Sequence, residues 1–211
     1  MLSYFLLVVS NLVPLAGVLY FDWSVSLLLL LYWCETGIIG FYNIFKIAKA
    51  NPEAETSKFN LMMWGKMPSS KGKLIIFFMF HFGVFMLCHL LFILIFVTSR
   101  DDVFLAINSF EPIKIFLYSV LALFLSHGYS FKENFFDGGE WKRVNPMVQM
   151  MKAYPRVVFM HLILLFSVVC SILLNLEGSK AVICIVVFLK IALDLAAHYK
   201  LHKRTKSQKL A

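Results

Sequence analysis

Long apolar stretches alternate with short polar segments along the whole chain. A membrane-spanning helix needs about 20 mostly apolar residues, and six stretches meet this requirement. They cover residues 2–21, 23–45, 74–97, 113–130, 157–174 and 181–199. The sequence lacks the alternating segments of about ten residues that are typical of a membrane β-barrel. The pattern therefore predicts an all-α, polytopic transmembrane bundle of about six helices. It forms one domain over 1–200, followed by a basic cytoplasmic tail over 201–211.

Composition supports the same class of protein. Apolar residues make up 60% of the 211 residues and charged residues only 15%, and the mean hydropathy is +0.78. Soluble domains have about 45–50% apolar and about 25% charged residues. These values exclude a soluble globular domain and a disordered chain, and they predict a multi-pass protein of the cell membrane.

The basic residues predict the orientation. Most of the 20 Lys and Arg residues follow the second, fourth and sixth apolar stretches. Because positive charge stays on the cytoplasmic side, both termini are expected there. The net charge of +8 is explained by this topology and by attraction to anionic headgroups, without a nucleic-acid-binding module. The expected partners are the lipid bilayer and a lipid or membrane-embedded substrate, with no nucleic acid. The oligomeric state stays open.

Ionisable residues inside the apolar stretches are the clearest indication of a site, because a charge at the bilayer centre costs roughly 2.5–3.5 kcal/mol. Depth follows from a helical rise of about 1.5 Å per residue, counted from the nearest basic residue. Five ionisable residues from five stretches fall in the cytoplasmic half by this measure. They are Glu35, His81, His127, His161 and Asp194, and His198 joins them near the interface. This grouping predicts a polar site inside the bundle.

Asp194 and His198 are four residues apart and therefore share one helix face. A carboxylate and a neutral imidazole are ligands that suit Zn, Fe or Mn. The hypothesis is a metal site formed by His81, His161, Asp194 and His198, with no other cofactor. In this hypothesis, Glu35 or Ser126 has a catalytic role as base or as orienting group.

Structural roles are the alternative for several polar and small residues. His198 also fits a side chain that extends to the interface. Asn43 is expected to hydrogen-bond between helices, and Gly37 and Gly40 to allow close helix approach. His89, nearer the external side, fits a packing histidine better than a ligand.

The second cytoplasmic segment, 131–154, is expected to be a loop between the fourth and fifth stretches. The paired residues Gly138 and Gly139 within it predict a tight turn.

The chain resembles a family of uncharacterised prokaryotic membrane proteins, a domain of unknown function, over most of its length. The residues that carry the resemblance are Tyr32-Trp33-Cys34-Glu35 with Gly40 and Asn43, His81-Phe82-Gly83 with His89, Ser126-His127-Gly128-Tyr129-Ser130-Phe131 with Asn134, and Asp194 with His198. The resemblance supports these residues as candidates for a site and implies no particular activity.

Two characterised families are similar in part. The ceramidase and adiponectin-receptor superfamily places His, Asp and Ser around an intramembrane zinc, but its members have seven spans. Rhomboid proteases have Ser and His on spans four and six, where Ser126 and His198 fall here. The surrounding Leu125-Ser126-His127-Gly128 departs from Gly-x-Ser-x-Gly, which argues against a serine protease.

Three functions are consistent with these observations. The first is a metal-dependent membrane hydrolase acting on a lipid or membrane-embedded substrate. The second is a non-catalytic membrane scaffold or assembly factor in which the polar residues only hold the helices together. The third is a small proton-coupled transporter. The sequence therefore leaves open whether the protein is an enzyme.

Overall fold

The computed structural model describes residues 20, 25–54, 70–98, 110–173 and 187–188. These residues form helices and turns, and no strand occurs among them. Nearly all of the predicted first and sixth spans, 2–21 and 181–199, lies outside the described residues. The predicted tail over 201–211 lies outside them as well.

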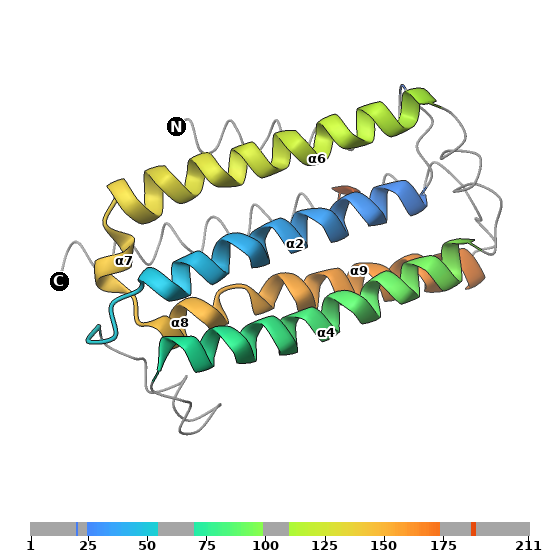
Figure 1. Cartoon of the computed structure of the whole chain (residues 1–211). Helices are drawn as coiled ribbons and strands as arrows, with labels where there is room; N and C mark the ends of the chain where they lie inside the picture. Colours follow the sequence, from blue (N-terminus) through green and yellow to red (C-terminus); the bar gives the residue numbers. More distant parts are fainter. Residues whose placement is uncertain (1–19, 21–24, 55–69, 99–109, 174–186, 189–211) are drawn as a thin grey trace.

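The long helices of the described residues run side by side (Figure 1). They are α2 (Val25–Lys49), α4 (Lys71–Thr98), α6 (Phe110–Ser130) and α9 (Tyr154–Leu173). They match the four predicted spans over 23–45, 74–97, 113–130 and 157–174, with ends that differ by a few residues. The all-helical class is therefore confirmed for the described part of the chain.

Among the described residues, four helical segments are long and apolar enough to cross a membrane. They are Leu27–Lys49, Lys71–Ile95, Ile113–Asp137 and Pro146–Ser167. Large apolar side chains such as Ile76, Phe80 and Ile95 are exposed on α4. An exposed apolar surface of this kind is typical of contact with lipid or with another protein. The span count of six and the cytoplasmic position of both termini stay predictions.

Helix α2 occupies the middle of the arrangement and packs against α4, α6, α8 and α9. Its close approach to α4 depends on Gly40. A Cβ atom at this position would lie 2.4 Å from Cε1 of Phe82, far inside van der Waals contact. The prediction that Gly40 permits close helix approach is thus confirmed. At Gly37 a Cβ would meet Met86 at an ordinary 3.5 Å.

The segment over 131–154 is not the loop that the sequence predicted. It forms a π-helix, η1 (Phe131–Asp137), and two short helices, α7 (Glu140–Arg143) and α8 (Pro146–Met151). The expected turn is present within it, since Gly139 has a left-handed φ of 65°. The prediction of a loop was wrong because apolar side chains in this segment are buried by tertiary contacts.

The buried residues of this segment pack on the end of α2. Phe135 and Val144 form one cluster with Ala50, while Met150 packs with Ile47 in another. Asn51, just beyond α2, ties the two parts together. Its side-chain nitrogen donates to the Lys142 carbonyl at 3.1 Å, and its backbone N–H lies 2.9 Å from the Trp141 carbonyl.

Asn145 stabilises the start of α8 in two ways. Its side-chain oxygen accepts a hydrogen bond from the N–H of Met147 at 3.0 Å, as an N-cap does. Its amide nitrogen donates to the Pro52 carbonyl at 3.0 Å. The helix pair α8 and α9 is thereby fixed against α2, and this fixes the direction in which α9 presents its first turn.

Candidate functional site

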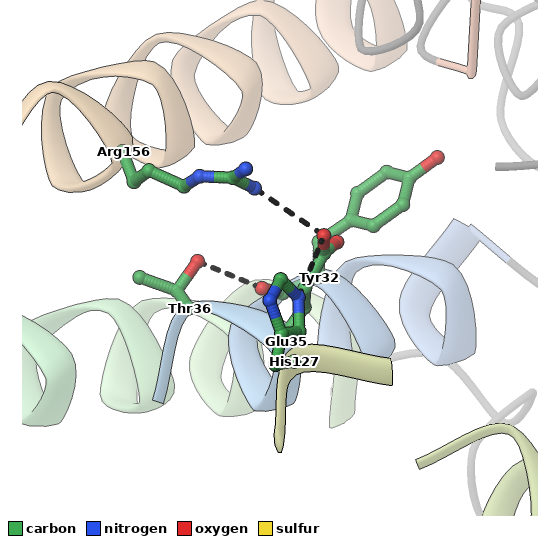
Figure 2. Close-up of polar contacts among 5 residues, drawn as sticks. All are labelled: Tyr32, Glu35, Thr36, His127 and Arg156. Atoms are coloured by element: carbon green, nitrogen blue, oxygen red, sulfur yellow. Dashed lines mark hydrogen bonds and ion pairs between the residues drawn. The ribbon is translucent and has the colours of Figure 1, made fainter. Parts of the chain in front are cut away.

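Glu35 lies in the middle of α2, and its carboxylate is the centre of the candidate site. The side chain is only 8% exposed. Two basic side chains from other helices approach the same carboxylate oxygen, Oε1. Arg156 Nη1 lies 3.3 Å from it, and His127 Nε2 lies 3.8 Å from it (Figure 2). The site therefore joins α2, α6 and α9.

The local sequence explains how each basic side chain reaches the acid. Arg156 belongs to the first turn of α9, which begins at Tyr154. His127 lies in the last turn of α6. The preceding packing of α8 against α2 brings the start of α9 to the depth of Glu35. Three residues that are far apart in sequence consequently meet at one atom.

The two basic partners retain partial exposure. The side chain of Arg156 is 32% exposed and that of His127 is 26% exposed. The carboxylate is therefore buried behind two cationic or protonatable groups that a ligand could still reach. This arrangement differs from a fully enclosed ion pair.

The distances indicate different interactions. At 3.3 Å, the guanidinium of Arg156 donates a charge-assisted hydrogen bond to Glu35. At 3.8 Å, His127 is beyond hydrogen-bond distance but attracts the carboxylate when it is protonated. Chemically, a carboxylate beside an imidazole can orient the ring and stabilise its protonated form.

The neighbouring Thr36 does not take part in this arrangement. Its hydroxyl donates to the Tyr32 carbonyl one turn earlier in α2, at 2.9 Å. Ser119 and Ser167 bond to their own helices in the same way. These three buried hydroxyls thus bond within their own helices, whereas the acid at Glu35 contacts basic groups from other helices.

The predicted metal ligand His81 lies on α4 and contacts the start of α9. Its Nδ1 lies 3.0 Å from the Tyr154 hydroxyl. Its ring stacks on Phe77 and meets Phe85 edge to face. The environment of His81 is therefore mostly aromatic.

The predicted ligand His161 lies beside His89 instead. The two rings have centroids 5.6 Å apart and planes inclined by 29°. Asp194 and His198 lie outside the described residues, so the predicted ligand set is not tested. Within the described part of the chain, no three His, Cys, Asp or Glu side chains form a group that could hold a metal.

Ser126, the other predicted catalytic residue, is half-buried on α6 and directly precedes His127. Successive residues of an α-helix point about 100° apart, so the two side chains leave α6 in different directions. Glu35 and His127, both singled out from the sequence, do come together.

Arg156 is the functional candidate that the sequence reasoning missed. It was counted among the basic residues that set the topology. The signal that points to it is Glu35 itself, because a carboxylate inside an apolar helix requires a cationic or hydrogen-bonding partner. A search for a partner among the basic residues that flank the other spans would have included Arg156.

A second buried polar pair lies nearer the end of α2. The Gln149 amide nitrogen donates to Asn43 Oδ1 at 2.9 Å, and Asn43 Nδ2 donates to the Met150 carbonyl at 3.4 Å. The prediction that Asn43 links helices is confirmed. Its partner Gln149 was not predicted, since it lies in the segment that the sequence indicated to be a loop.

In the part of the chain that the structure describes, fold and site together define a helical membrane-protein candidate, with four helices able to span a membrane and a carboxylate buried between helices. The whole chain, residues 1–211, matches the family of unknown function DUF6498, and the protein belongs to this family. No curated protein and no solved structure shows a significant match to it.

Proposed function

We propose that the protein is an integral membrane protein of the cell membrane that uses Glu35, His127 and Arg156 as an acid–base site. Its substrate would be a lipid or another membrane-embedded molecule, and the reaction would be a hydrolysis. The observation that carries this proposal is the buried carboxylate of Glu35, which meets basic groups from two other helices that remain partly exposed.

The cost of burial supports a functional reading. A charged group in an apolar environment is strongly destabilising unless it is paired. An apolar residue at position 35 would avoid this cost. Intramembrane ionisable residues are, for this reason, mostly functional.

The proposed reaction uses each side chain for one task. Arg156 holds the Glu35 carboxylate in place, and Glu35 orients the imidazole of His127. His127 accepts a proton from a water molecule, and the resulting hydroxide adds to the ester group of the substrate. The leaving alcohol then takes the proton from His127, which restores the site and releases an acid and an alcohol.

A metal-dependent form of this hydrolase would use the sequence-predicted ligands His81, His161, Asp194 and His198 with Zn, Fe or Mn. A metal ion would supply hydroxide by lowering the pKa of its bound water. Two of these four residues are described, and they have different neighbours. The metal-free site at Glu35 is therefore the form that the described geometry supports better.

The test is a lipid-turnover experiment with the full chain in liposomes. The purified protein is incubated in vesicles of a total membrane lipid extract, and products are followed over time by mass spectrometry. We expect hydrolysis products with the wild type and a loss of at least about 100-fold in rate with His127→Gln, since general base catalysis typically contributes 10²–10⁴-fold.

Glu133→Gln is the control, because Glu133 is exposed on η1, just beyond α6, and its substitution leaves Glu35, His127 and Arg156 in place. Its rate should equal that of the wild type. Equal product formation by His127→Gln and wild type would contradict the proposal, as would the absence of any product from folded wild-type protein.

A scaffold or assembly factor is the second candidate. It is favoured by two polar contacts between helices. The Glu35–Arg156 pair connects α2 to α9, and the Asn43–Gln149 pair connects α2 to α8. The charge-swapped variant Glu35→Arg/Arg156→Glu separates the candidates, because it keeps an ion pair and removes the carboxylate beside His127. A scaffold would keep its stability and cellular phenotype, whereas the proposed enzyme would keep stability and lose turnover.

A further inference from the structure

Two histidines face each other between α4 and α9, apart from the contacts that Glu35 makes. His89 lies on α4 and His161 on α9, and their ring centroids are 5.6 Å apart. His89 is 3% exposed. His161 is exposed. The pair thus has one enclosed member and one member that can be approached from outside.

The buried histidine, His89, lacks hydrogen-bond partners within the described part of the chain. Neither Nδ1 nor Nε2 of His89 has a hydrogen-bond partner there. A buried polar atom without a partner costs about 1–3 kcal/mol, which is large compared with the net stability of a protein. Stacking on His161 leaves the ring nitrogens, which lie in the ring plane, unsatisfied.

A bound ligand would remove this cost, and the surroundings indicate its chemistry. The imidazole nitrogens are lone-pair donors to metal ions, and imidazole suits Zn, Cu, Fe and Ni. Ile93, Met160 and Leu164, on the same two helices, are buried apolar residues of the neighbouring core. Two neutral nitrogen donors in such an environment favour a transition metal over Ca²⁺ or Mg²⁺, which require several oxygen ligands.

The separation of the two rings fits this chemistry. With metal–nitrogen distances of about 2.0 Å, two imidazoles on one ion have centroids roughly 5–6 Å apart. The observed 5.6 Å lies within this interval. The ring planes are inclined by only 29°, so the imidazoles have to turn about their own side-chain bonds before a nitrogen of each points at one ion.

We propose that His89 and His161 form a binding site for Zn²⁺ or a similar imidazole-binding transition-metal ion. The two side chains supply two ligands and leave the remaining positions of the ion open to water or to a small ligand. This site differs from the sequence-predicted set, because it includes His89 and does not use His81. It is also independent of the acid–base site at Glu35.

The test is a Zn²⁺ titration of the full chain in lipid nanodiscs, purified through an affinity tag without histidine. Bound zinc is measured by elemental analysis after equilibrium dialysis. We expect about one Zn²⁺ per chain in the wild type. In His89→Gln and in His161→Gln the affinity should fall at least about tenfold, because losing even an outer-shell partner of a ligand costs about 10–100-fold.

His81→Gln is the matched control, since it removes an imidazole from the same helix without touching the pair. It should bind zinc as the wild type does. Loss of zinc in His81→Gln with retention in His89→Gln would overturn the proposal in favour of the sequence-predicted set. Undiminished binding in both His89→Gln and His161→Gln, or no binding by the wild type, would also overturn it.

Thermal unfolding gives a second readout that does not depend on any activity. An ion that binds only the folded protein raises its unfolding temperature by mass action. Zn²⁺ should raise this temperature in the wild type and in His81→Gln, but not in His161→Gln. Because His161 is exposed, its variant tests the proposal even where the substitution of the buried His89 impairs folding.

Discussion

Thr36 and Glu35, two neighbouring buried polar residues of α2, find their hydrogen-bond partners in different ways. Thr36 donates to a carbonyl of its own helix, while its neighbour Glu35 depends on α6 and α9. A hydroxyl has one proton to place and finds an acceptor one turn away. A carboxylate has only acceptors, and the N–H groups of a helix interior are already used, so its partners must come from elsewhere.

The first prediction concerns the coupling between Glu35 and Arg156. Arg156→Met should lower the free energy of unfolding by about 1–3 kcal/mol, because it removes the charge-assisted hydrogen bond at 3.3 Å to a buried carboxylate. In the double variant Glu35→Gln/Arg156→Met the loss should be smaller than the sum of the single losses by about 0.5–3 kcal/mol. The free energy of unfolding is measured in detergent micelles for the wild type, the two single variants and the double variant.

The exposed ion pair of Glu140 and Lys152 is the control for this cycle. Its side chains are about a third exposed, and surface pairs contribute about 0–1 kcal/mol. Equal coupling energies for the two pairs would show that the burial of Glu35 has no energetic consequence.

The sequence predicted Glu35 and His127 as members of one site but not Arg156. Depth along the helix axis locates Cα atoms and contains no information about the reach of a side chain. Arg156 begins near a helix end, yet its guanidinium reaches an acid 121 residues earlier in the chain. The site to which a long flexible side chain belongs therefore depends on the position of its charged group. The amino-acid sequence does not give that position.

At the scale of elements, the close packing of α2 against α4 depends on the absence of a side chain at Gly40. The ring of Phe82 occupies the space that a side chain at position 40 would need. Close-packed interiors cannot absorb an added methyl group without shifts in rotamer or backbone. With Phe82 in its present position, α2 and α4 can keep this spacing because residue 40 has no side chain.

The second prediction follows from this contact. Gly40→Ala should lower the free energy of unfolding by about 1–3 kcal/mol through overpacking, and Phe82→Leu should partly restore it in the double variant. Gly83→Ala is the matched control on α4, because a Cβ there has no neighbour within 4 Å. It should raise stability by about 0.5–1 kcal/mol through helix propensity.

Thermal unfolding compares the stability of the wild type, Gly40→Ala, Gly40→Ala/Phe82→Leu and Gly83→Ala. If Gly40→Ala and Gly83→Ala changed stability alike, the contact of Phe82 with α2 would not determine the helix spacing.

The long helices were predictable because their apolar runs exceed the length of a span, whereas the short helices over 131–154 were not. That segment contains Gly138, Gly139 and several charged residues, all typical of loops. Its helices are stabilised by Phe135, Val144 and Met150 against α2. Such contacts depend on which element lies opposite, and local propensity carries no information about that.

At the scale of the whole molecule, α2 connects the described helices, since it packs against α4, α6, α8 and α9. The predicted orientation would place the basic ends of α2 and α4 together on the cytoplasmic side. Lys71 Nζ donates to the Ala48 carbonyl at 3.1 Å, which shows that these two ends are neighbours.

The third prediction tests this orientation with reporter fusions. A fluorescent protein fused after residue 211 should fluoresce, and alkaline phosphatase at that site should be inactive, because the cytoplasm supports only the former. Fusions after residue 105, in the predicted external segment, should give the reverse. The same reporter signal at both sites would refute the topology that the basic residues predict.

The long separation in sequence between Glu35 and its partners has a consequence for biosynthesis. A ribosome adds about 5–20 residues each second, so Arg156 is made roughly 6–24 s after Glu35. During this interval a nascent α2 carries an acid without the two bases that later surround it. In a membrane, such a helix would be retained near the insertion machinery or at the water boundary until α9 arrives. We therefore expect release of α2 into lipid to be a late event, and a ribosome stalled before residue 156 should leave α2 extractable from the bilayer.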